Sequence, residues 1–243
     1  AIINETQPQK NLSLRGDWKT NIAFFNNKTQ PRILKFSQFE NYLISSDDRD
    51  NITVFDWEQK NQLSRFSNGN PFGTKITDLK LLNEDDLPLL LTGSSDGIVK
   101  IYKDFHSTDE SRLVSSWRAL TDLLLTPRST GLLMEWQQSR GSLLVTGDVK
   151  VIRIWDAPRE LCVVDVPARS SSSITSLTSD QVAGNIFVSG FADGTIRVYD
   201  RRLDPRDSMV KLWKVKDEER PTSITNVHMQ RGGYRELVSG SSN

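Results

Sequence analysis

Cysteine and histidine are nearly missing from this chain. Among its 243 residues, Cys162 is the one cysteine, and His106 and His228 are the two histidines. A single cysteine excludes a disulfide within the chain, and it also excludes a zinc site built from several cysteines. This scarcity indicates a reducing compartment. Because Cys162 lies in the apolar run LCVV, we expect it to be a small core residue.

An excess of charge of one sign is missing as well. The 31 basic residues balance 31 acidic residues, so the formal net charge is zero, and nucleic acid or an anionic membrane finds no positive excess to bind. No apolar run approaches the length that crosses a bilayer, and the start, AIINETQPQK, lacks the features of a signal peptide. We therefore expect a soluble, cytoplasmic protein with no nucleic-acid partner and no direct membrane insertion.

Motifs of catalysis are also absent. The sequence contains no Gly-x-Ser-x-Gly, no His-Glu-x-x-His and no glycine-rich phosphate loop. Two acidic clusters, 47–50 (DDRD) and 84–86 (EDD), resemble metal or glycosidase carboxylates, but no partner ligand motif accompanies them. Solvated acidic turns are the favoured interpretation, and a hydrolase that uses Asp47 and Asp48 stays open as an alternative. We expect no enzyme activity, no metal and no cofactor.

What the sequence does contain is a repeat. Each copy has an apolar strand that usually ends in a Ser/Thr-Gly step, a short polar turn, and an alternating strand that ends in an aromatic residue. Copies span 42–56, 89–103, 143–156 and 187–200, and a fifth begins at Leu237. Their spacing of about 43 to 54 residues is close to the ~40 to 45 of one propeller blade. A further short apolar strand precedes each copy and another separates the copies, which gives four strands per unit.

This pattern predicts an all-β fold, a WD40-type β-propeller. About five blade units are visible, the last one is truncated, and we expect seven blades in the parent protein. Residues 32–243 form the incomplete propeller in this interpretation. Residues 1–31 are expected to be an extended entry segment, with an outer strand for the first unit around 22–25. An incomplete ring should leave sheet edges open.

The motif residues have specific expected roles. Asp-Gly steps in two of the turns predict tight hairpins, because glycine tolerates positive φ and aspartate accepts backbone N–H groups. The aromatic-Asp endings are variants of the Trp-Asp dipeptide. No histidine follows a glycine, so we expect stability from apolar packing between blades instead of a histidine-linked network. The motif residues are Phe55, Asp56, Gly93, Asp96, Gly97, Gly147, Asp148, Trp155, Asp156, Gly190, Asp193, Gly194, Tyr199 and Asp200.

Several segments resemble a known family. They are 54–71 (VFDWEQKNQLSRFSNGNP), 89–105 (LLLTGSSDGIVKIYKDF), 131–160 (GLLMEWQQSRGSLLVTGDVKVIRIWDAPRE) and 176–202 (SLTSDQVAGNIFVSGFADGTIRVYDRR). They are similar to the C-terminal WD-repeat domain of Raptor, the scaffold subunit of the first TOR kinase complex. The resemblance covers roughly residues 32–243, and the loops look like those of a fungal member.

The resemblance implies a non-enzymatic docking domain of a large parent protein. The family binds the TOR kinase and presents its substrates in nutrient-responsive growth signalling, at the cytoplasmic face of the vacuole or lysosome. Expected partners are therefore subunits of the TOR kinase complex and its substrates or regulators. The family's main substrate and kinase contacts lie on other domains, so no partner-binding residue is assigned here. A substrate receptor of a ubiquitin ligase and a coat or trafficking subunit stay open as alternatives.

Overall fold

The computed structural model describes residues 23–121, 123, 130–215, 222–230 and 236–242. Within them, four antiparallel sheets have four strands each and a fifth has two. Blade 1 contains β1 (Pro31–Phe36), β2 (Tyr42–Asp47), β3 (Asn51–Asp56) and β4 (Asn61–Ser67). Blade 2 contains β5 (Ile76–Leu82), β6 (Leu89–Ser94), β7 (Ile98–Lys103) and β8 (Arg112–Arg118).

The remaining sheets repeat this order. Blade 3 contains β9 (Leu133–Gln137), β10 (Ser142–Thr146), β11 (Val151–Asp156) and β12 (Leu161–Pro167). Blade 4 contains β13 (Ile174–Ser179), β14 (Ile186–Phe191), β15 (Thr195–Asp200) and β16 (Met209–Lys214). Blade 5 contains β17 (Ile224–Met229) and β18 (Leu237–Ser241). A short 3-10 helix, η1 (Gln138–Arg140), connects β9 to β10.

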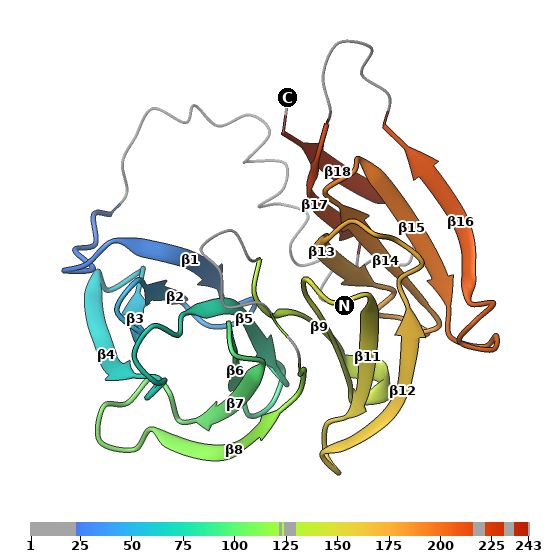
Figure 1. The fold of residues 1–243 in the computed structure, drawn as a ribbon. Helices are drawn as coiled ribbons and strands as arrows, with labels where there is room; N and C mark the ends of the chain where they lie inside the picture. Colours follow the sequence, from blue (N-terminus) through green and yellow to red (C-terminus); the bar gives the residue numbers. More distant parts are fainter. Residues whose placement is uncertain (1–22, 122, 124–129, 216–221, 231–235, 243) are drawn as a thin grey trace.

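The blades follow one another around a centre, as Figure 1 shows. In each four-stranded sheet the strands pair in chain order, so that the first is innermost and the fourth outermost. The prediction of an all-β propeller with a truncated fifth unit is confirmed. Middle strands are buried on both faces, as in β10, where all five residues are buried. Such strands are rich in apolar residues because each sheet lies between two neighbours.

The hydrophobic core is divided into clusters that lie between consecutive blades. One cluster joins Leu144 and Ile154 of blade 3 to Phe187 and Tyr199 of blade 4. Similar clusters join blades 1 and 2, blades 2 and 3, and blades 4 and 5. Apolar packing between blades was predicted, and these clusters confirm it. Burial of this kind stabilises by about 25 cal/mol per Å² of apolar surface.

The outer strand predicted for residues 22–25 is not found. Residues 23–30 contain no strand, and β4 already occupies the outer place of blade 1. This segment instead packs across the blade, with the Phe25 ring centroid 5.1 Å from that of Phe55. The carbonyl of Asn27 accepts a hydrogen bond from Arg65 at 2.8 Å. Residues 1–22 of the predicted entry segment lie outside the described residues.

Cys162 is exposed, so the prediction of a core residue was wrong. It lies in β12, where Leu161 and Val163 are also exposed, by 59% and 61%. Because β12 is the outermost strand of blade 3, the first part of the strand has no neighbouring sheet over it. An apolar run in an edge strand therefore looks like a core strand in the sequence, although it lies at the surface.

Candidate functional site

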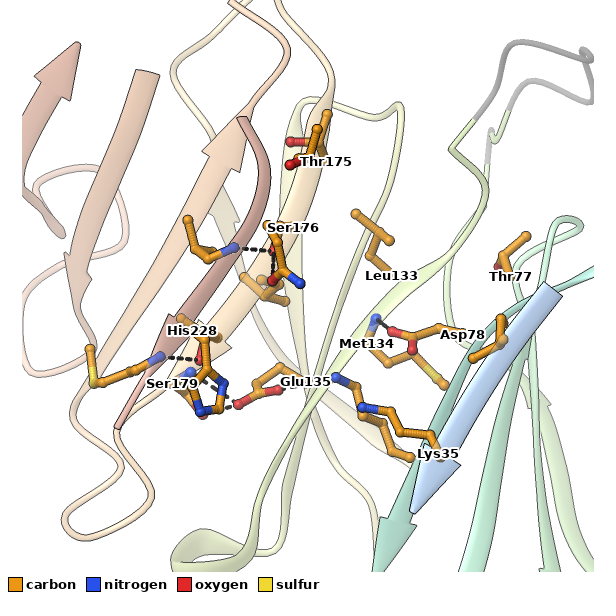
Figure 2. Close-up of a pocket in the computed structure, with 18 of the residues that line it drawn as sticks. Lys35, Thr77, Asp78, Leu133, Met134, Glu135, Thr175, Ser176, Ser179 and His228 are labelled. Atoms are coloured by element: carbon orange, nitrogen blue, oxygen red, sulfur yellow. Dashed lines mark hydrogen bonds and ion pairs between the residues drawn. The ribbon is translucent and has the colours of Figure 1, made fainter. Parts of the chain in front are cut away.

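The inner strands of the five blades partly surround a channel with a cavity of about 410 Å³ (Figure 2). Its walls come from β1, β5, β9, β13 and β17, and polar side chains predominate among the labelled residues. A polar cavity at the centre of a ring is the natural place to look for chemistry. The contacts of the side chains in this wall show whether they are available for a reaction or are used to join the blades.

Polar side chains of one inner strand satisfy main-chain donors of the next. Asp78 Oδ2 of β5 accepts the N–H of Met134 in β9 at 2.7 Å. Ser176 Oγ of β13 accepts the N–H of Val227 in β17 at 2.8 Å. Thr178 Oγ1 accepts the N–H of Met229 at 3.1 Å. We call these bonds the inner ladder, and they supply partners to strand edges that have no adjacent strand.

Charged groups extend the inner ladder across three blades. Lys80 Nζ of blade 2 lies 3.4 Å from Glu135 Oε2 of blade 3. Glu135 Oε1 accepts the N–H and the hydroxyl of Ser179 in blade 4, both at 3.0 Å, and the amide of Gln181 at 3.0 Å. Figure 2 shows Glu135 with Ser179 on one side of it and Lys35 on the other. The carboxylate is fully occupied by structural partners.

Asp78 is a carboxyl group of this wall that lies in a low-dielectric environment. Burial raises the pKa of Asp78 above its usual range, although Lys80, the N–H of Met134 and Lys35 act in the opposite direction. A raised pKa can mark a catalytic acid, but the carboxylate here accepts the main chain of β9. The structure assigns Asp78 a structural role.

A metal centre finds no support among the described residues. No group of three or more His, Cys, Asp and Glu side chains in that part of the chain is placed to hold a metal ion. His228 lies at the cavity wall and is exposed, whereas His106 stacks on Tyr42 with ring centroids 5.6 Å apart. No described helix is long and apolar enough to cross a membrane.

The aromatic residues that end each third strand fasten one blade to the preceding one. Trp155 Nε1 donates to the carbonyl of Ala119 at 3.0 Å, and the hydroxyl of Tyr199 donates to the carbonyl of Ala168 at 3.0 Å. Tyr102 makes the equivalent bond in blade 2, to Asn68 at 3.1 Å. Each acceptor directly follows an outer strand. Phe55 has no donor and packs on Phe25 instead.

The aspartates after these aromatic residues cap the turn to the outer strand. Asp56 Oδ1 accepts the N–H groups of Glu58 and Gln59 at 2.9 and 2.8 Å. Asp156 accepts the N–H of Arg159 at 3.2 Å. Asp200 accepts the N–H of Arg202 at 3.0 Å. An aspartate that bonds the main chain two or three residues later forms a local turn. The dipeptide is therefore architectural at both positions.

The Asp-Gly steps form the hairpin turns between second and third strands. Gly97 and Gly194 have φ values of +84° and +78°, a conformation that favours glycine. A Cβ atom at Gly97 would also lie 1.9 Å from the carbonyl oxygen of Leu120. Asp96 accepts the N–H of Ile98 at 3.2 Å, and Asp193 accepts the N–H of Thr195 at 3.0 Å.

Three other motif glycines lie close against another segment of the ring. A Cβ atom at Gly93 would lie 2.9 Å from Leu132, and one at Gly190 would lie 2.5 Å from Ile224. A Cβ atom at Gly147 would lie 2.5 Å from the carbonyl oxygen of Gly131. The neighbouring Asp148 accepts the hydroxyl of Thr130 at 3.1 Å. These glycines allow neighbouring backbones to approach closely.

The acidic cluster at 47–50 is only partly the solvated turn that we expected. Asp47 is buried and pairs with Arg65 at 2.8 Å. Its carboxylate also accepts the N–H groups of Arg49 and Asn51 at 2.9 and 2.8 Å. Although burial raises the pKa of Asp47, hydrogen bonds from Thr29, Asn51 and Arg49 hold it below the usual value. Asp48 is exposed, so the two neighbouring carboxylates lie in different environments.

The second acidic cluster lies at the other end of the strands. Glu84 Oε2 accepts the N–H of Gln38 at 2.7 Å and the hydroxyl of Ser37 at 3.2 Å, both from blade 1. Asp85 and Asp86 are exposed. The cluster at 84–86 is thus an acidic turn that is tied to the preceding blade through its first residue.

Sequence reasoning missed the inner ladder. The segments ITDLKLL and ITSLTS were interpreted as apolar strands, yet Asp78, Lys80, Ser176 and Thr178 in them carry the contacts between blades. The signal was present as polar residues at alternate positions of β5 and β13. The partners of these residues lie in other sheets, so no local sequence pattern predicts which residues they are.

Comparison with known proteins places the repeat in a family. The model of the "WD domain, G-beta repeat" matches residues 162–200. The Saccharomyces cerevisiae target of rapamycin complex 1 subunit KOG1 is 65% identical over 243 residues, which is 100% of this chain and 16% of that protein. The Schizosaccharomyces pombe subunit mip1 is 50% identical over 99% of this chain and 18% of its own length. The Dictyostelium discoideum raptor homolog is 35% identical over 86% of this chain and 14% of its own length.

Solved structures agree with this likeness. The crystal structure of Chaetomium thermophilum Raptor superposes with a TM-score of 0.90 at 52% identity, over 100% of this chain and 22% of that one. A chain of the mitotic checkpoint complex superposes with a TM-score of 0.67 at 14% identity, over 90% of this chain and 59% of its own length, and shows the fold alone. The higher identity with the two yeasts than with Dictyostelium fits a fungal sequence. With 65% identity along its whole length and the backbone of a solved Raptor, this chain belongs to the Raptor family, and it spans about a sixth of the length of the yeast relatives.

Proposed function

We propose that the chain is a non-enzymatic docking domain of a scaffold subunit in a TOR kinase complex. The observation that carries the proposal is the 65% identity, along the full chain, with a protein named as a subunit of target of rapamycin complex 1. The channel geometry supports a non-enzymatic role, because Asp78 and Glu135 are occupied by bonds that join blades. A rigid ring with variable loops suits docking.

We further propose that the domain helps to assemble the complex and to present substrates or regulators to its kinase. In this proposal the parent protein is cytoplasmic and associates with the surface of the vacuole or lysosome through its partners. The family resemblance supports these assignments. Fluorescence microscopy of the tagged parent beside a vacuolar membrane marker tests the location, and uniform cytoplasmic signal in nutrient-rich cells would contradict it.

The decisive experiment purifies the tagged parent protein from its own cells, with and without residues 32–243, and identifies the co-purifying proteins by mass spectrometry. We expect the TOR kinase with the intact parent, and we expect the deletion to lose the partners that the propeller holds. Comparison at equal amounts of soluble parent protein controls for poor folding. Recovery of ligase or coat subunits without the kinase would overturn the proposal.

A further inference from the structure

A groove of about 480 Å³ opens where the inner strands of blades 1, 2 and 3 end. We call it the turn groove. It shares Lys80 and Glu135 with the inner ladder, and the turns after β1 and β5 and the start of η1 form its rim. Its lining includes Phe36, Phe39, Leu81, Trp136, Glu84 and Asp85.

Aromatic side chains line the turn groove and remain accessible. Phe39 is 44% exposed and Phe36 is 65% exposed. Trp136 donates its indole N–H to Gln138 Oε1 at 2.6 Å, so its one polar atom already has a partner. These rings offer apolar surface, which gains free energy when a partner removes it from water.

The walls of the turn groove are fixed in place by contacts between blades. Glu84 of blade 2 accepts the N–H of Gln38 in blade 1 at 2.7 Å. Gln138 of blade 3 donates its amide to Asn83 Oδ1 of blade 2 at 2.8 Å. Because the three turns are tied together before any ligand arrives, the groove loses less conformational entropy when it binds a partner segment.

One edge of the turn groove is acidic. Asp85 and Asp86 are exposed, and within the part of the chain that the structure describes no Lys or Arg nitrogen lies within 4 Å of either carboxylate or of Glu84. Two lysines also line the groove: Lys80 is engaged by Glu135, and Lys35 acts on the buried Asp78, whose pKa it lowers. Apolar rings beside acidic side chains complement a segment that carries an apolar side chain next to a cation.

We propose that the turn groove binds an extended segment of a partner protein in which one aromatic side chain is flanked by Lys or Arg. The aromatic side chain contacts Phe39 and Trp136, and the cations face Glu84 and Asp85. Phe36 occupies the same place in β1 as Leu81 in β5 and Trp136 in β9, and those two side chains pack within the clusters between blades. A neighbouring blade would cover Phe36 in the same way, so Phe36 is not substituted in the test. The inference rests on the groove alone and does not depend on the TOR complex.

The test measures fluorescence anisotropy of a fluorescein-labelled short peptide in which one tryptophan is flanked on both sides by Lys and Arg. We expect saturable binding to the full chain that weakens as salt is raised. Peptides with the tryptophan replaced by alanine, or with the cations replaced by glutamate, should bind at least about fivefold more weakly. Equal binding of all three peptides would overturn the proposal.

Matched variants of the chain locate the binding site. Phe39→Ala and Asp85→Lys should each weaken binding of the tryptophan peptide by about fivefold or more. Phe72→Ala and Asp48→Lys are the controls, because these side chains are exposed at the opposite ends of β5 and β2. All four residues are exposed, so thermal melting should show that each variant stays folded. Unchanged binding by Phe39→Ala or Asp85→Lys, or equal losses in the controls, would contradict the assignment.

Discussion

Asp200 illustrates how one turn residue can carry a pH-dependent part of the stability. Hydrogen bonds from the Arg202 side chain and from its N–H lower the pKa of Asp200 to about 2. An unfolded aspartate titrates near ~3.9. The folded-state pKa is the lower one, so this stabilisation is fully present above about pH 4 and is lost as the pH falls towards 2.

We therefore predict that Asp200→Asn lowers the urea midpoint of the chain at pH 7. The difference between the variant and the unaltered chain should shrink as the pH falls from about 4 to 2, because the carboxyl group becomes protonated. Urea unfolding at a series of pH values measures it. A difference that stays constant down to pH 2 would show that the carboxylate charge is not the cause.

Gly190 and Gly240 form a matched pair at the same place in two blades. A Cβ atom at Gly190 would lie 2.5 Å from Ile224 Cγ2, whereas one at Gly240 would meet its nearest neighbour, Thr225, at 3.4 Å. We predict that Gly190→Ala destabilises by about 1–3 kcal/mol through overpacking, and that Gly240→Ala stays within about 0.5 kcal/mol. Urea midpoints of both variants test this. Equal losses would refute the role of close approach.

Local patterns predicted some residues and misled at others. The sequence of Asp-Gly at 96–97 and 193–194 is enough to predict a turn, because its conformation depends on the residues within it. Asp47 and Cys162 were assigned to the wrong environment. Burial of Asp47 depends on Arg65, and exposure of Cys162 depends on the outer position of β12. Neither relation is visible in a short segment of sequence.

The inner strands are the elements whose edges need the most support. Each has a free edge towards the channel, and Asp78 satisfies one donor of β9 from the side. Because burial raises the pKa of Asp78, its charged form is unfavourable in the folded chain, and this cost is greatest above the folded-state pKa. The hydrogen bond and the charge can be separated by substitution.

We predict that Asp78→Asn stays within about 1 kcal/mol of the unaltered chain at pH 7, because the amide oxygen still accepts the Met134 N–H and no charge is buried, whereas the Leu79 N–H loses its Oδ1 acceptor. Asp78→Ala should lose about 1–3 kcal/mol, because both N–H groups are left without their acceptor. Lowering the pH should raise the stability of the unaltered chain relative to that of Asp78→Asn. The reason is that a raised folded-state pKa means that Asp78 binds its proton more tightly in the folded chain than in the unfolded one. Urea unfolding at pH 7 and pH 4.5 measures both. Equal losses for the two variants would contradict the assignment.

The strands themselves were predictable from the sequence, whereas the inner ladder was not. Alternation and turn residues around Ile196 and Asp193 specify a hairpin without reference to the rest of the chain. The contact from Ser176 to the N–H of Val227 joins residues of different sheets. Their proximity depends on how the blades stagger around the ring, which the repeat period alone does not determine.

At the scale of the whole molecule, the core belongs to pairs of blades. Phe187 is fully buried and stacks on Tyr199 with ring centroids 4.8 Å apart. It also belongs to a cluster with Leu144 and Ile154 of the preceding blade. Loss of the Phe187 aromatic ring should therefore disturb two sheets and not one.

We predict that Phe187→Ala costs about 3–5 kcal/mol and raises amide hydrogen exchange in β10 and β11 of blade 3 as well as in β14 and β15 of blade 4. The strands of blade 1 are the internal control and should keep their protection. Mass spectrometry of exchanged peptides measures this. An increase confined to blade 4 would show that each blade unfolds independently.

The two ends of the ring expose surface that is covered elsewhere. Leu34 of β1 is 58% exposed, whereas Leu79 and Met134, at the same place in β5 and β9, are 0% and 1% exposed. Both pack within the clusters between blades. The exposed Leu34 is what an additional blade before blade 1 would cover. The number of seven blades for the parent stays a prediction.

The matched WD repeat, residues 162–200, begins in β12 of blade 3 and ends in β15 of blade 4. The unit of sequence is therefore offset from the unit of structure by one strand. If such a unit were duplicated in a gene, the new copy would supply the outer strand of one blade together with three strands of the next. Each copy is thus part of two neighbouring blades and connects them covalently. A ring can therefore gain whole units while every sheet stays connected to the next one through the chain.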